Sequence, residues 1–169
     1  MRFPDFLRTS VLLFGGAATA LAIVAIAGAR ADDNTALLYI AVGWWFLAAL
    51  GGLWYGRRPD LNDGFGRLLS EARTSPTLPE QRPGAIIVNR LWVLGLFTIL
   101  TGSVAFLLPQ IPAMACGFLL FIGLLWRRQS AAVDAIEGRD GVRFYVEPVS
   151  PFQPLKLVRT PGFTRAEPA

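Results

Sequence analysis

The sequence predicts an all-α integral membrane protein with four transmembrane helices arranged as two hairpins, followed by a small cytoplasmic tail that can form a β-hairpin. Residues 91–126 carry no charged side chain and are too long for one crossing, because about 20 apolar residues span the hydrocarbon core of a bilayer. Two further uncharged stretches, residues 9–29 and 34–56, stand upstream. Only 17% of the 169 residues are charged, against about 25% in a typical soluble domain.

The composition argues against most catalytic chemistry. The chain contains no histidine, which is the commonest general base and metal ligand in proteins. Its single cysteine, Cys116, lies within an apolar stretch, so we expect it to pack rather than to react as a nucleophile. The sequence contains no phosphate-binding loop, dinucleotide fingerprint or zinc-ligand spacing. We therefore expect a protein that is not an enzyme and that holds no cofactor and no metal.

The first helix has two interpretations. Arg2 and Arg8 precede the apolar stretch, and Ala29-Arg30-Ala31 has the small-x-small pattern of a signal-peptide cleavage site. The apolar stretch is longer than the core of about 7–15 residues that signal peptides carry. We therefore favour a retained transmembrane helix, with a cleaved signal peptide as the alternative.

Small residues at spacings of three and four mark one face of the first and third predicted helices. Such faces let helix backbones approach each other closely in lipid. The predicted helix-packing residues are Gly15, Ala18, Ala22 and Ala25 in the first helix and Gly95, Gly102 and Ala105 in the third. Trp44 and Trp45 fall near the middle of the second helix, and we expect these bulky rings to pack against the small face of the first helix.

The distribution of arginine predicts the orientation. Cytoplasmic segments of membrane proteins carry an excess of Lys and Arg. Basic residues crowd residues 1–8, 57–90 and 127–165, whereas Arg30 stands alone between the first two helices. We expect a multi-pass protein of the inner (plasma) membrane with both termini in the cytoplasm. The same bias accounts for the net charge of +4, so no nucleic-acid partner is expected.

The chain divides into four predicted segments. These are the first transmembrane hairpin (1–56), a cytoplasmic loop with a short amphipathic helix over 64–73 (57–84), the second transmembrane hairpin (85–128) and the cytoplasmic tail (129–169).

The tail combines strand-like alternation with many aromatic residues. Val142, Phe144 and Val146 alternate with their neighbours as in a half-buried strand, and a second strand is expected around Leu157. A lone hairpin is only marginally stable in water, so we expect the tail to pack on the 57–84 loop, to lie on the membrane surface or to pair with another protein. The alternative is a loose, solvated tail. The candidate partner-docking residues are Phe144, Tyr145, Phe152 and Phe163.

The expected role is non-catalytic: an accessory or scaffold subunit of a larger membrane assembly, in contact with membrane lipid and with another membrane protein or a second copy of the chain. The four apolar stretches carry no acidic or basic side chain, which argues against proton-driven transport. The alternative is a small transporter or channel subunit that acts as an oligomer, with a pore lined by Thr98, Thr101 and Ser103. A third interpretation is an enzyme with a carboxylate site at Asp134 and Glu137, which share a helix face.

Overall fold

A computed structural model describes residues 1–57, 69, 72–74, 83–147 and 156–161 of the chain. Two of the docking candidates, Phe152 and Phe163, lie outside this described part. Most of the amphipathic helix predicted over 64–73 also lies outside it, and Arg73, the last residue of that prediction, is in a strand.

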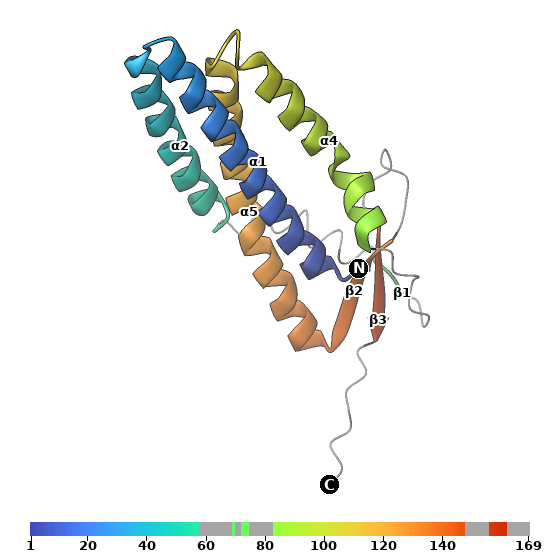
Figure 1. The fold of residues 1–169 in the computed structure, drawn as a ribbon. Helices are drawn as coiled ribbons and strands as arrows, with labels where there is room; N and C mark the ends of the chain where they lie inside the picture. The colour runs from blue at the N-terminus through green and yellow to red at the C-terminus, as the bar shows by residue number, and fades with distance from the viewer. Residues whose placement is uncertain (58–68, 70–71, 75–82, 148–155, 162–169) are drawn as a thin grey trace.

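Four long helices dominate the described part of the chain. They are α1 (Phe3–Ala31), α2 (Thr35–Tyr55), α4 (Pro83–Val104) and α5 (Gln110–Asp140). Each is long and apolar enough to cross a membrane, which confirms the prediction of a helical, multi-pass membrane protein. Figure 1 shows the α1–α2 and α4–α5 turns together at one end of the bundle, with the N-terminus and the strands at the other.

Helix α5 is the central helix of the bundle. Both α1 and α2 pack more extensively against α5 than against each other, and α4 packs mainly along α1. Eleven residues of α5 are buried, whereas Ile86 and Thr101 are the two buried residues of α4. The two predicted hairpins therefore pack together mainly through α5 of the second hairpin, which contacts both α1 and α2 of the first.

Local sequence sets the helix ends. Pro4 lies in the first turn of α1, where its missing N–H leaves no hydrogen bond unmade. The side-chain oxygen of Asn34 caps α2 by accepting a hydrogen bond from the Leu37 N–H at 3.0 Å. Helix α5 ends at Gly141, whose φ of 61° is a left-handed conformation that glycine adopts without strain.

A small three-stranded sheet lies at the end of the bundle opposite the two turns. Its strands are β1 (Arg73–Thr74), β2 (Val142–Val146) and β3 (Leu157–Pro161), in the order β1-β3-β2. Strands β2 and β3 are antiparallel, and β1 runs parallel to β3. The strand pair predicted for the tail is therefore present, and the loop after α2 contributes a third strand.

The N-terminus adjoins the free edge of β2. The Val146 N–H donates a hydrogen bond to the Met1 carbonyl at 3.0 Å, and Arg2 forms an antiparallel bridge with Tyr145. The first two residues thus tie the start of α1 to a strand that is more than 140 positions away in sequence.

The largest apolar core lies between this sheet and the helices. Its buried side chains are Met1, Phe3, Phe6, Leu7, Ile86, Val133, Val142, Phe144, Val146 and Leu157. Residues 1–7 supply four of them, so the N-terminal segment is a structural part of the fold.

Helices α1 and α5 are longer than one membrane crossing requires. With 29 and 31 residues they extend about 44 and 46 Å at a rise of about 1.5 Å per residue, against a hydrocarbon core of about 30 Å. The uncharged stretch ends at residue 126, and α5 continues without a break to Asp140. The additional turns of α5 carry the charged residues and pack against the sheet.

Candidate functional site: the arginine-rich end of the bundle

The predicted small face of α1 is largely buried against α5. Ala18 and Ala25 are 1% and 2% exposed, and Ala18 belongs to an apolar cluster that includes Ala115 of α5. Ala22 is half-buried beside the same cluster. Gly15 differs, because a Cβ built on it would meet no atom within 4 Å. No close backbone approach within the described chain therefore requires glycine at this position.

The predicted small face of α4 is in contact only toward its C-terminal end. Ala105 is 3% exposed, and its carbonyl oxygen would lie 3.3 Å from a Cβ placed on Gly28. Gly102 faces Leu21 at 3.8 Å by the same measure. Gly95 is exposed, and a Cβ built there would meet nothing within 4 Å. The N-terminal half of this face is thus open.

The two mid-helix tryptophans both donate hydrogen bonds to α5. The Trp44 Nε1–H donates to the Met114 carbonyl at 3.1 Å, and the Trp45 Nε1–H donates to the Ala113 carbonyl at 2.7 Å. An indole N–H in lipid has no water to bond, so a backbone carbonyl is a strong attraction. The expectation that these rings pack on the first helix holds in part for Trp45, which also contacts the α1 clusters. Trp44 packs against α5 instead.

Glycines on α2 and α5, which the sequence analysis did not include among the packing residues, bring these two helices together. A Cβ on Gly117 would lie 2.0 Å from Trp44 Nε1, and one on Gly52 would lie 2.8 Å from the Phe121 carbonyl oxygen. Both distances are too short for any side chain. The Gly52–Gly56 spacing of four was the available signal, and it marks an intramolecular contact with α5.

Glu137 organises the polar side of the sheet core. Its Oε2 accepts a hydrogen bond from Arg2 Nη2 at 2.5 Å, and its Oε1 accepts one from the Phe144 N–H at 2.9 Å. The Glu137 side chain is only 5% exposed, and its hydrogen bond raises the pKa of Arg2. One carboxylate therefore connects the N-terminus, α5 and β2.

The two other carboxylates of α5 also pair with arginines. Asp134 accepts a hydrogen bond from Arg8 at 2.5 Å, and Asp140 accepts one from Arg139 at 2.8 Å. The Arg139 guanidinium lowers the pKa of Asp140. The acidic residues that sequence spacing placed on one helix face are thus each engaged in an ion pair.

The structure buries two of the four docking candidates within the chain itself. Phe144 and Tyr145 are 3% and 6% exposed, because β2 lies between β3 and the N-terminal segment. Their selection assumed that the tail had nothing to bury its aromatic rings, and for these two that assumption is wrong. Phe144 and Tyr145 are therefore not exposed for docking to another protein.

The three hydroxyl residues proposed to line a pore do not share one face of α4. Thr101 is buried and Ser103 is exposed, as expected for positions about 200° apart on a helix. The Thr98 and Ser103 hydroxyls donate to the carbonyls of Leu94 and Ile99 in their own helix. Both hydroxyls are thus hydrogen-bonded within their own helix and need no water from a channel as a partner.

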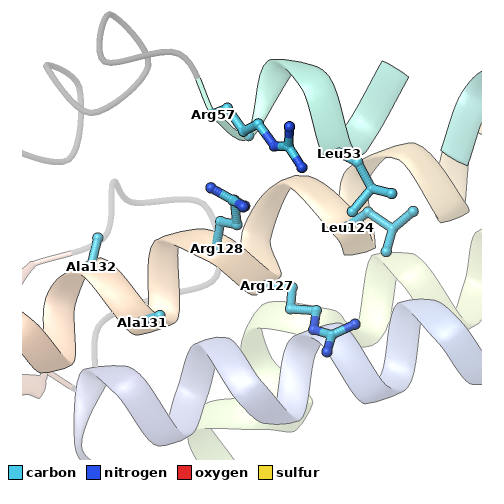
Figure 2. Close-up of a pocket in the computed structure, with 8 residues that line it drawn as sticks. Leu53, Arg57, Leu124, Arg127, Arg128, Ala131 and Ala132 are labelled. Atoms are coloured by element: carbon cyan, nitrogen blue, oxygen red, sulfur yellow. The ribbon is translucent and has the colours of Figure 1, made fainter. Parts of the chain in front are cut away.

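A cavity of about 610 Å³ opens between the end of α2 and α5. It is lined by Leu53, Gly56, Arg57, Leu124, Arg127, Arg128, Ala131 and Ala132. Figure 2 shows Arg57 reaching from the end of α2 toward α5, and Arg128 rising from α5 toward the end of α2. Arg127 extends from the other side of the α5 backbone in this view. The Arg57 and Arg128 side chains thus lie on the same side of α5 at this opening, and the described residues that line it include no carboxylate.

Comparison with known proteins gives no relative from which a function could be transferred: no protein family, curated protein or solved structure matches the chain. The arguments below therefore rest on the chain's own residues.

Proposed function

We propose that this protein is a non-catalytic, multi-pass subunit of the inner (plasma) membrane that acts as an accessory or scaffold component of a larger membrane assembly. The observation that supports this most is the sparse packing of α4. This helix runs for 22 residues and buries two of them, whereas α5 buries eleven of 31. Helix α2 is also peripheral, but it packs closely along α5.

The outer face of α4 has a shape that suits another helix. Val88, Trp92, Gly95 and Ile99 lie at spacings of four, three and four, and each is exposed. Gly95 makes a notch between larger side chains. Glycine in a helix interior is less stable than alanine by about 1 kcal/mol, and no contact within the described chain explains it here. Close approach by a helix of another membrane protein, or of a second copy, would use the notch.

Replacing Gly95 with leucine tests this proposal. Gly43 on α2 is the matched control, because it is exposed and a Cβ there also meets no atom within 4 Å. In mild detergent we expect the wild-type chain and Gly43→Leu to migrate in one assembly larger than a monomer. Gly95→Leu should shift toward the monomer while it keeps its helical circular dichroism. Identical migration of all three proteins would contradict a role for α4.

The proposed orientation places both termini in the cytoplasm. It is supported by the position of basic residues along the helices: Arg8 follows the start of α1 and Arg57 follows the end of α2, whereas Arg30 lies in the last turn of α1. The start of α1 lies at the sheet end of the bundle and its last turn at the opposite end. Cysteines introduced as Asp33→Cys or Arg159→Cys into a Cys116→Ala background should react with a membrane-impermeant maleimide from opposite faces of sealed vesicles. Labelling of both from one face would overturn the topology.

A further inference from the structure

We propose that the cavity lined by Arg57, Arg127 and Arg128 binds the phosphate headgroup of an anionic phospholipid. The proposal rests on the membrane placement of the chain and not on the accessory role of α4, so the two can fail separately. It adds a defined lipid site to a protein that otherwise only contacts lipid in general.

The charges of the lining favour a phosphate. Arginine presents donors in a planar fork that matches phosphate oxygens, and this opening is lined by Arg57, just after α2, and by Arg127 and Arg128 of α5. In the described chain Asp134 and Glu137, the first acidic residues that follow the cavity arginines on α5, pair with Arg8 and Arg2 instead. The cavity arginines therefore retain donors for an anion.

The position of the cavity favours a lipid over a free anion. Leu53 and Leu124 form its wall toward the membrane-crossing part of the bundle, and the arginines stand at the polar end. Nearby, the rings of Tyr55 and Phe121 are in edge contact at 6.0 Å. An apolar wall below a basic rim matches an acyl chain below a phosphate, and basic pockets between transmembrane helices are a common form of headgroup site.

Gly56 allows the end of α2 to lie close to α5 beside the cavity. A Cβ on Gly56 would lie 3.6 Å from Arg128 Cδ and 3.7 Å from Leu125 Cα. The last turn of α2 thus lies close against α5, and the stem of Arg128 crosses it. This contact fixes one side of the opening, and the volume of about 610 Å³ is within the range of about 300–1,000 Å³ for small-molecule sites.

A thermal-shift titration of the full chain in a neutral detergent tests the proposal. The probes are phosphatidylglycerol, phosphatidylcholine and inorganic phosphate at equal concentrations. We expect phosphatidylglycerol to raise the melting temperature of the wild type and phosphatidylcholine to leave it unchanged. The same rise with inorganic phosphate would assign the site to a soluble anion and overturn the lipid assignment.

Three variants separate a built site from general positive charge. Replacing all three cavity arginines with glutamine should weaken the apparent affinity for phosphatidylglycerol by about tenfold or more, since each charge-assisted contact contributes appreciably. The control triple Arg30→Gln, Arg73→Gln, Arg159→Gln removes the same charge from exposed positions outside the cavity and should bind as the wild type does. Equal losses in the two triples would overturn the proposal.

Replacing the three cavity arginines with lysine keeps both the net charge and the positive bias that orients the chain. This variant serves if the glutamine triple fails to fold or insert. It should melt as the wild type does without lipid and bind phosphatidylglycerol severalfold more weakly, because lysine lacks the planar fork. Unchanged binding would show that no specific arginine geometry is used.

Discussion

The two ends of α1 are held to α5 by different means. Near the sheet, large side chains close the core: Phe3 is fully buried and Phe6 is 4% exposed, and Glu137 adds an ion pair to Arg2. In the membrane-crossing part the buried residues of α1 include Ala18 and Ala25, and the contacts depend on close backbones. The same pair of helices thus changes its packing chemistry along its length.

The difference reflects the solvent on either side of the boundary. In water, burial of a phenylalanine ring is strongly favourable. In lipid an apolar side chain gains little by leaving its surroundings, so close packing and hydrogen bonds hold helices together. The edge contact of Phe14 with Trp126, at 5.6 Å, lies where α5 passes from its uncharged stretch to Arg127. Substitutions on the two sides of this contact should therefore have different effects.

The largest effect is expected for Phe3→Ala. This side chain is 0% exposed in the core beneath the sheet, and removal of a buried ring destabilises by about 3–5 kcal/mol. Reversible unfolding in detergent, followed by circular dichroism, would measure the change. Phe46→Ala is the control, because Phe46 is 63% exposed on the outer face of α2 and its loss should change the stability by less than about 1 kcal/mol. Similar losses for both would mean that the sheet core does not stabilise the fold.

Glu137→Ala should have the next largest effect. It leaves the Phe144 N–H without its acceptor and Arg2 without its partner. An unsatisfied buried donor costs about 1–3 kcal/mol, and the pair with Arg2 adds a smaller amount because Arg2 is 40% exposed. We expect a loss of about 2–3 kcal/mol in the same assay. Glu137→Gln keeps an acceptor for the N–H and should lose clearly less, whereas equal losses would assign the effect to the charge alone.

The sequence was sufficient to predict the helices because their signal is local. An uncharged stretch of sufficient length identifies a crossing, and all four predicted crossings are helices in the structure. Alternation in Val142–Val146 likewise identified β2. The arrangement of the helices was less accessible, because the predicted hairpins assumed that neighbours in sequence pack together. The dominant contact of α1 is instead with α5, and it depends on contacts between residues about 100 positions apart.

The polar end could be predicted only in part for the same reason. Basic residues at helix ends are visible in sequence, and the cavity arginines were counted in the orientation argument. That Arg57 of α2 and Arg128 of α5 line one opening follows from the α2–α5 contact, which no local pattern encodes. The pairing of Arg2 with Glu137 spans 135 positions and was equally inaccessible. By contrast, Gly52 and Gly56 were visible as a motif, and only their partner was unknown.

The smallest of the three effects is expected in the membrane-crossing part, for Gly117→Ala. The added Cβ would lie 2.0 Å from Trp44 Nε1, so the indole must move and its hydrogen bond to the Met114 carbonyl must lengthen. Overpacking of this kind costs about 1–3 kcal/mol. In a Trp44→Ala background the same substitution meets no ring, so its own contribution should fall close to zero, and the two changes should be strongly non-additive. Additive losses would show that the contact of Gly117 with Trp44 does not hold α2 and α5 together. The proposed difference in packing between the two ends of the bundle would then lack support in the membrane-crossing part.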